Sequence, residues 1–238
     1  MRRFVRALDG RDDETGTLLA VYRYRRLMLI LRTRRRARRV HSTVELELAR
    51  DLKCDRGAII EVWPRTHSRL SVGTGSRLRR NVVIQLKGGT AELGERVDVR
   101  RGTRFSVAGH FTSEGRNIYG DFDAVHCANR VIVREMAAFS EYVVIADSSH
   151  THTDPENWFY HDVKAGTVEI GRNTWLAAKA TIARGAVVGN CCVVAANAVV
   201  IGTVPDNHFA SGNPCEVRPL PYSWAESAPA STNRNAPR

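Results

Sequence analysis

What the sequence lacks excludes several classes of protein. No run of apolar residues approaches the roughly 18 that a membrane-spanning helix needs. The N-terminus lacks the basic-then-apolar pattern of a secretory signal peptide. The five cysteines form no CxxC pair and are odd in number, which argues against both a disulfide framework and a zinc knuckle. We therefore expect a protein of the reducing cytoplasm.

Acidic residues are scarce in the first 40 residues. That segment holds thirteen arginines but only four acids, so +9 of the net charge of +11 lies there and the remainder is nearly neutral. The basic charge is thus a property of an N-terminal extension. This extension could be a solvated or subunit-packing segment, or it could contact an anionic membrane surface. No basic groove interleaved with aromatic residues accompanies it, so we expect no nucleic-acid partner.

A six-residue rhythm fills the C-terminal part of the chain. Each block opens with an aliphatic residue, and a Gly or Ala follows in second place; the openings are Ile170, Leu176, Ile182, Val188 and Val194. A helix repeating every 3.6 residues cannot hold this register, and simple strand alternation does not explain the small second residue. The period is typical of a β-helix, whose coils are short flat faces joined at tight corners.

Weaker copies of the rhythm extend upstream. Their openings are Val133, Phe139 and Ile145, then Leu93, Val99 and Phe105, then Val72, Leu78 and Ile84. Residues 111–132 fit poorly, with Ile118 and Ala124 as candidate openings. We predict an all-β fold, a parallel β-helix prism over residues 56–217. An Arg-rich extension over 1–55 precedes it, and a short cap and tail over 218–238 follow.

Outside the repeats the sequence pattern fits more than one kind of element. Residues 18–39 contain neither Gly nor Pro and fit a basic helix, although the apolar run 27–31 fits a strand equally well. Within the repeats, extra residues fall after the third opening of a coil. The largest insertion, 146–169, holds the densest group of chemically reactive side chains. Because repeat proteins collect binding insertions on one face, we expect the functional site there.

Three segments in order resemble a known family. They are the histidine-bearing insertion 145–150, the repeat block 168–175 and the closing segment 204–215. Together they resemble the left-handed β-helix hexapeptide-repeat acyltransferases, in particular sugar O-acetyltransferases of the galactoside and maltose type and their polysaccharide-modifying relatives. The resemblance implies a left-handed coil and a homotrimer with active sites between neighbouring prisms. It further implies acetyl-CoA as acyl donor and a hydroxyl of a sugar or polysaccharide precursor as acceptor.

The resemblance also assigns catalytic residues. Acyl transfer to an alcohol needs a base for the hydroxyl proton, and histidine suits that role. His150 falls on the position of the family's base, with His152, two residues on, as its rival or as a substrate contact. Asp147 could orient the imidazole, although relatives also use a backbone carbonyl for this.

Coenzyme and acceptor contacts follow from the same match. Trp175, Ala178 and Ala196 fall on positions that border the coenzyme in the family, where small side chains let the backbone approach. Relatives often carry a lysine at the position of Gly202, and this lysine reaches the coenzyme phosphates. Because this chain has glycine there, the resemblance leaves Arg218 or Arg184 to contact the phosphates. Trp158 could line the acceptor pocket.

Several alternatives stay open. His150, His152 and His161 with Asp154 permit a metal site, as in the gamma-class carbonic anhydrases, but the ligand spacing of those enzymes is not reproduced and we expect no metal. An N-acyltransferase acting on an amino sugar is the alternative within enzymes. A non-catalytic trimeric scaffold, with the basic extension holding a partner or the inner face of the membrane, is the alternative outside them.

Overall fold

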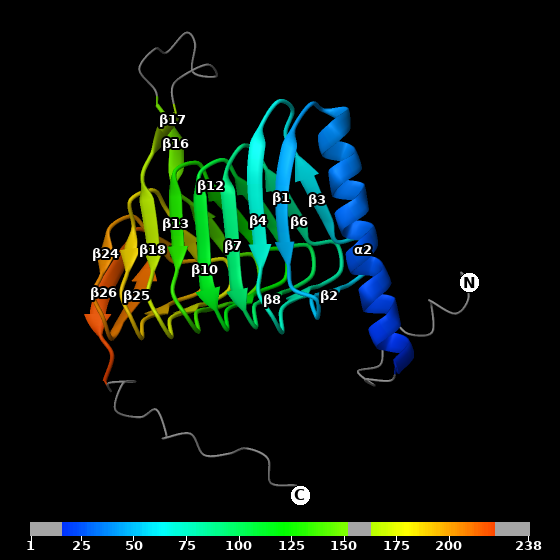
Figure 1. Ribbon diagram of the computed structural model, residues 1–238. Helices are drawn as coiled ribbons and strands as arrows, with labels where there is room; N and C mark the ends of the chain where they lie inside the picture. Colours follow the sequence, from blue (N-terminus) through cyan, green and yellow to red (C-terminus); the bar gives the residue numbers. More distant parts are fainter. Residues whose placement is uncertain (1–15, 152–162, 222–238) are drawn as a thin grey trace, which may run out of the picture.

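The protein is a three-sided β-solenoid with a helix at one end. The computed structural model describes residues 16–151 and 163–221 of the chain. The helix α2 (Gly16–Arg39) precedes three parallel sheets, and the chain visits the sheets in a fixed order, one strand in each per coil. Figure 1 shows the coils stacked side by side from α2 to the C-terminal strands. The predicted parallel β-helix is therefore confirmed.

The three sheets differ mainly in strand length. The first sheet contains β1 (Thr43–Leu48), β4 (His67–Val72), β7 (Thr90–Glu95), β10 (His110–Gly115), β13 (Arg130–Val133), β18 (Thr167–Ile170), β21 (Val187–Val188) and β24 (Thr203–Val204). The second contains β2 (Lys53–Cys54), β5 (Arg77–Leu78), β8 (Asp98–Val99), β11 (Ile118–Tyr119), β14 (Ala138–Phe139), β19 (Trp175–Leu176), β22 (Val193–Val194), β25 (His208–Gly212) and β26 (Cys215–Pro219). The third contains β3 (Ile59–Val62), β6 (Val83–Leu86), β9 (Arg104–Val107), β12 (Ala124–Cys127), β15 (Val144–Ala146), β20 (Thr181–Ile182) and β23 (Val199–Val200).

The six-residue rhythm has a direct physical cause. The block-opening residues point into the prism; Ile170, Leu176 and Ile182 are fully buried. At Gly171 even a Cβ would collide with the carbonyl carbon of Gly189 in the next coil, so no side chain fits at that position. The aliphatic side chains form one continuous core along the axis, and the small residues let neighbouring coils approach to hydrogen-bonding distance.

The coils shorten toward the C-terminus. In the first sheet Leu46 pairs with Leu70, a separation of 24 residues, whereas Val188 pairs with Val204, a separation of 16. The early coils therefore have longer faces and hold larger side chains. Only the later coils approach the minimal repeat, which is why the rhythm is clearest there.

Residues 111–132 form a regular coil, contrary to their poor fit to the template. Ser113, Tyr119 and Val125 open its three faces and are buried. The predicted openings at Ile118 and Ala124 are wrong by one residue, since Ile118 is 37% exposed. A polar and an aromatic residue occupy positions where the pattern calls for aliphatic ones, and this hid the register.

Both ends of the solenoid are covered. The helix α2 lies across β1, β2 and β3, and its Leu29 is buried in the same core as the first coil. Residues 18–39 are thus helical, and a helix over the first coil protects its free strand edges. The coils begin at Thr43, ahead of the predicted boundary at 56, and β26 folds back antiparallel on β25 at the far end. Within residues 16–151 and 163–221, no helix is both long and apolar enough to cross a bilayer.

Candidate active site

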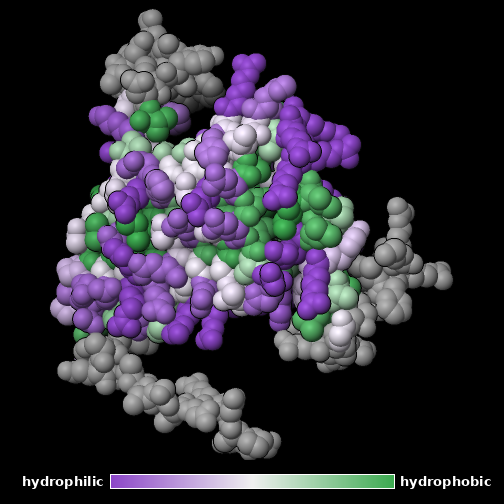
Figure 2. Space-filling model, viewed as in Figure 1, coloured by the Kyte–Doolittle hydropathy of each residue, from purple (hydrophilic) through white to green (hydrophobic). Residues whose placement is uncertain are grey.

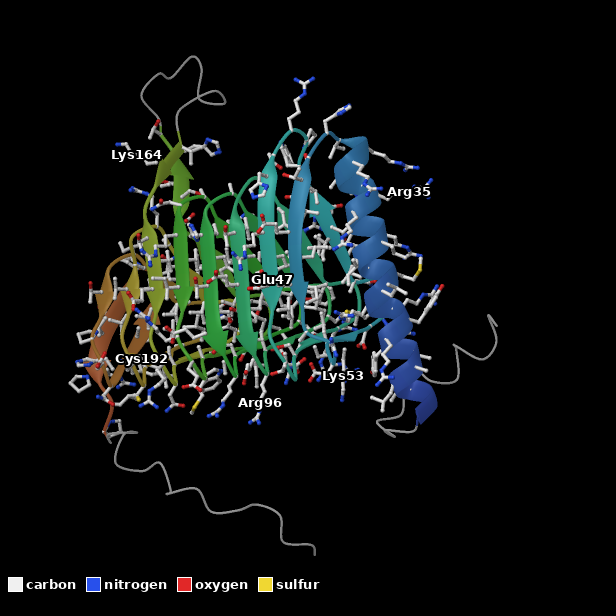
Figure 3. All side chains as sticks on the ribbon, viewed as in Figure 1. Arg35, Glu47, Lys53, Arg96, Lys164 and Cys192 are labelled. Atoms are coloured by element: carbon white, nitrogen blue, oxygen red, sulfur yellow. The ribbon has the colours of Figure 1, made fainter. Side chains whose placement is uncertain are left out.

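A short hairpin interrupts the solenoid at one corner. Strands β16 (Ser148–His150) and β17 (Val163–Ala165) leave the prism between β15 of the third sheet and β18 of the first. They pair antiparallel, with His150 opposite Val163 and Ser149 opposite Lys164. Figure 3 shows Lys164 on this hairpin, away from the stacked coils. His150 is exposed at the end of β16, so its ring is accessible from outside the prism.

Asp147 fixes the base of the hairpin. Its side chain is completely buried, and its two carboxylate oxygens accept hydrogen bonds of 2.7 Å from the backbone N–H groups of Ala128 and Asn129. Its carbonyl also accepts a bond from the backbone N–H of Gly166, on the returning strand. Asp147 therefore ties both strands of the hairpin to the preceding coil. This structural role was not foreseen, and orientation of the His150 imidazole by Asp147 stays a prediction.

Replacing Asp147 by Ala is expected to destabilise the fold. The backbone N–H groups of Ala128 and Asn129 would lose their shared acceptor, and each lost hydrogen bond costs about 0.5–1.5 kcal/mol. Asp51→Ala is the matched control, because Asp51 accepts a comparable backbone bond from Gly75 at an exposed corner. Urea unfolding of both variants measures the difference. If D147A unfolds like the wild type but loses activity, the carboxylate acts on His150 and not on the fold.

His150 borders a groove that runs onto the third sheet. The groove has a volume of about 410 Å³, and its lining includes His150, Val163, His126, Lys87, Ser106 and Cys127. The hairpin forms one wall, and the outward side chains of neighbouring coils form the floor. The groove is therefore large enough for a small molecule beside His150.

His126 is a second histidine in the groove that the sequence analysis missed. It lies on β12 and pairs with Ala146, the residue before Asp147. Partial burial and the positive charge of Lys87 lower the pKa of His126, so the neutral imidazole is favoured. The 20-residue spacing from 126 to 146 could have placed it here, but the mistaken register of residues 111–132 concealed that spacing.

Cys127 lies in the groove but is not a nucleophile. Burial raises the pKa of its thiol to about 12, so the reactive thiolate is not formed near neutral pH. All five cysteines are free. In the described part of the chain no three His, Cys, Asp or Glu side chains gather into a metal-binding group. The raised pKa of the Cys127 thiol therefore argues against a covalent cysteine intermediate in the groove.

The predicted coenzyme contacts lie elsewhere on the prism. Trp175 is on the second sheet, 49% exposed, and its indole N–H donates to the Ser140 hydroxyl at 3.1 Å. Ala178 and Ala196 lie at the corner between the second and third sheets, where the backbone N–H of Asn197 bonds to the Ala178 carbonyl. The structure thus brings these three residues to a different corner from His150.

The remaining predicted residues fall in three places. Arg218 lies on β26, with its guanidinium 4.8 Å from the centre of the Phe209 ring. Arg184, the alternative phosphate contact, donates to the Ser149 hydroxyl at 3.1 Å and so stands beside the hairpin. His152 and Trp158, like His161 and Asp154, lie outside the described residues.

Fold and site together define a parallel β-helix with a histidine-bearing hairpin at one corner. Residues 167–202 match the family described as bacterial transferase hexapeptide (six repeats). Over these residues the chain resembles the hexapeptide-repeat transferases. The matched segment begins directly after the hairpin and covers the shortest coils.

Individual relatives are similar in sequence to parts of this chain. A Staphylococcus aureus (strain Mu50) protein named as an acetyltransferase is 35% identical over 71 residues, which are 29% of this chain and 36% of the relative. An Escherichia coli (strain K12) protein named as a lipopolysaccharide biosynthesis O-acetyl transferase, WbbJ, is 30% identical over 105 residues. These residues are 40% of this chain and 54% of the relative. The matches thus span between about a third and about half of these curated relatives, and they relate the chain distantly to acetyltransferases.

The solved structures extend the likeness in fold. The polysialic acid O-acetyltransferase OatWY matches 82% of this chain and 94% of its own, with a TM-score of 0.56 and 13% sequence identity. At that identity the likeness shows a shared β-helix and no more. It covers coils well upstream of residues 167–202, so the fold relationship is wider than the sequence relationship.

Proposed function

We propose that this protein is a CoA-dependent O-acyltransferase, with acetyl-CoA as donor and a hydroxyl of a sugar or polysaccharide precursor as acceptor. The observation that carries the proposal is the position of His150. It is exposed on a hairpin that leaves the coil just before the matched transferase repeats, and it borders an open groove. The distant kinship with named acetyltransferases, including a lipopolysaccharide O-acetyl transferase, supports the donor and the acceptor class.

The chemistry assigned to His150 is general base catalysis. Its imidazole takes the proton of the acceptor hydroxyl while the hydroxyl oxygen attacks the thioester carbonyl carbon. The tetrahedral intermediate then collapses, the carbon–sulfur bond breaks, and the CoA thiolate leaves and takes up the proton held by the imidazole. No acyl-enzyme is formed, in keeping with the protonated thiol of Cys127. A backbone N–H aimed at the thioester oxygen would stabilise the oxyanion.

A trimer is part of the proposal. His150 and the residues assigned to the coenzyme, Trp175, Ala178 and Ala196, lie at separate corners of one prism. A complete site then forms where the hairpin corner of one protomer meets the coenzyme corner of its neighbour. Homotrimeric packing of three-sided prisms supplies that arrangement three times.

Binding of acetyl-CoA tests the proposal against a non-catalytic scaffold. A ligand at 100 times its dissociation constant adds about 2.7 kcal/mol to the stability of the folded state. For a chain of this size that corresponds to a rise of roughly 5–10 °C in the melting temperature. Desulfo-CoA is expected to raise the melting temperature by a similar amount. Free pantetheine should raise it less, because pantetheine lacks the phosphates. No rise with either nucleotide-bearing ligand would contradict the proposal.

An acceptor screen then separates O- from N-acylation. Release of free CoA thiol is measured with acetyl-CoA and matched pairs of sugars that differ only in a hydroxyl or an amino group at one carbon. The proposal expects release with the hydroxyl member of a pair. Release confined to amino sugars would assign the protein to the N-acyltransferases.

A further inference from the structure

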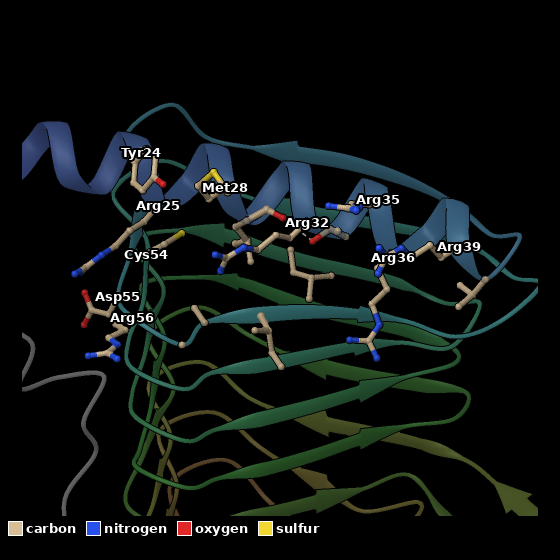
Figure 4. Close-up of a pocket in the computed structure, with 17 residues that line it drawn as sticks. Tyr24, Arg25, Met28, Arg32, Arg35, Arg36, Arg39, Cys54, Asp55 and Arg56 are labelled. Atoms are coloured by element: carbon tan, nitrogen blue, oxygen red, sulfur yellow. Dashed lines mark hydrogen bonds between the residues drawn. The ribbon is translucent and has the colours of Figure 1, made fainter. Parts of the chain in front are cut away.

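A basic groove separates α2 from the first coil, far from the hairpin. It has a volume of about 620 Å³ and lies between the helix and β3. Six arginines line it: Arg25, Arg32, Arg35, Arg36 and Arg39 from the helix, and Arg56 from the coil. Figure 4 shows Arg32 and Arg36 extending from α2 toward the coil. This concentration of positive charge is unlike the nearly neutral body of the solenoid.

Acidic side chains do not neutralise the groove. Asp55 is the one acid in its lining, and both of its carboxylate oxygens accept bonds of 3.2 Å from Arg77. Glu61 lies 3.8 Å from Arg36 at the margin. Among the described residues, no ion pair involves Arg32, Arg35 or Arg39. The groove therefore has the charge to hold anions such as phosphate groups.

The same groove has an apolar floor. Met28 and Leu29 of the helix and Ile59 and Ile60 of β3 lie between the arginines. A free inorganic anion would gain nothing from these side chains. An anion attached to hydrocarbon would contact both, with its charged group at the arginines and its apolar part against the floor.

The outer face of α2 is also apolar. Tyr24, Leu27 and Leu31, spaced three and four residues apart, share one side of the helix and are 57%, 51% and 49% exposed. Figure 2 shows an apolar patch among hydrophilic residues at this end of the molecule. Arg35, which lines the groove, stands where the groove meets this face, and Figure 3 shows its side chain pointing away from the coils. Apolar residues flanked by arginines on one helix face are typical of interfacial membrane helices.

We propose that α2 docks the protein on an anionic bilayer surface, with lipid phosphate groups in the arginine groove and Tyr24, Leu27 and Leu31 in the interface. Charge complementarity selects this occupant, since the cytoplasmic leaflet carries anionic lipid. The exposed leucines favour lipid over nucleic acid, because a polyanion in water offers them no apolar partner. The helix is too polar to span, in agreement with a peripheral contact. The inference does not depend on the acyltransfer reaction.

Flotation of the full chain with vesicles tests the docking. Binding is expected to vesicles of equal parts phosphatidylcholine and phosphatidylglycerol and not to phosphatidylcholine alone, and added salt should weaken it. The triple variant Arg32→Gln, Arg35→Gln, Arg39→Gln is expected to bind about a hundredfold more weakly, since each basic residue near the surface contributes about fivefold. The double variant Leu27→Gln, Leu31→Gln is expected to lose at least about tenfold.

Matched controls separate docking from net charge. The triple variant Arg96→Gln, Arg100→Gln, Arg172→Gln removes the same charge from exposed corners of the solenoid and is expected to bind like the wild type. Equal weakening in both triple variants would overturn the proposal. Normal vesicle binding by the leucine variant would also overturn the proposal, and so would dissociation of the protein into monomers by the leucine substitutions. Preferential binding of duplex DNA over vesicles by the arginine groove would overturn it as well. Transfer to a soluble acceptor should stay unchanged in all three variants, so that failure of docking and failure of the proposed activity are read separately.

Discussion

The variant His150→Ala is expected to transfer acyl groups about 10²- to 10⁴-fold more slowly than the wild type, the usual contribution of a general base. The loss should appear in kcat, because the imidazole acts on the proton in the transition state and not on ground-state binding. Affinity for acetyl-CoA should be kept, since the proposed coenzyme contacts come from Trp175, Ala178 and Ala196 and not from His150. Thiol release at saturating acetyl-CoA measures the rate, and thermal stabilisation by acetyl-CoA measures binding.

Three further histidine variants locate the base if the expectation fails. His67→Ala is the neutral control, because His67 is an exposed residue of the first coils, paired with Thr43. A rate retained in H150A and lost in His152→Ala would move the base two residues along the insertion. A rate lost only in His126→Ala would place the base on the third sheet. Retention in all of them would contradict histidine catalysis.

Replacing Tyr119 by Ala is expected to cost about 3–5 kcal/mol of unfolding free energy, as for other large buried aromatics. Tyr119 is fully buried in the middle of the prism, at the centre of an aromatic cluster. Its ring centre lies 5.1 Å from that of Phe105, 6.4 Å from that of Phe111 and 4.9 Å from that of Phe139, all at steep angles. Truncation would leave a cavity that three coils border, and edge-to-face contacts would be lost as well.

Ile118→Ala is the matched control for Tyr119→Ala. Ile118 is the neighbouring residue on β11 but points outward, so its truncation should change stability by no more than about 0.5 kcal/mol. Chemical unfolding of the pair therefore tests the register of this coil. A larger cost at Ile118 than at Tyr119 would contradict the inward position of Tyr119.

The shortest coils are predictable from sequence because a single rule governs them. Each face there is as short as a corner-to-corner step allows, so Ile170, Leu176 and Ile182 must be aliphatic and their followers small. The longer coils leave room for other solutions. Ser113 opens a face as a buried polar residue, and its hydroxyl accepts a bond from the Asn117 side chain at 2.7 Å. A rule based on apolar openings cannot recognise such a pair.

The candidate site was predictable in part for the same reason. His150 stands out because an insertion breaks a regular pattern, and a break is visible in sequence. The bonds of Asp147 to Ala128 and Asn129 cross between coils, so only the correct register reveals them. His126 enters the groove by register alone, and local sequence around it carries no sign of this. Contacts between coils are thus the part that sequence reasoning missed.

The parallel stacking of coils also fixes the distance between the helix-covered end of the solenoid and the hairpin. In the third sheet, β15, from which the hairpin departs, is four strands away from β3, which α2 covers. Neighbouring strands are about 4.8 Å apart, so the four spacings place the hairpin corner about 19 Å above the first coil. Because α2 lies between the first coil and the bilayer, a lipid-anchored acceptor must extend by more than that height to reach His150, whereas a soluble acceptor meets no such limit. The number of coils would then select acceptors by the length of their anchor.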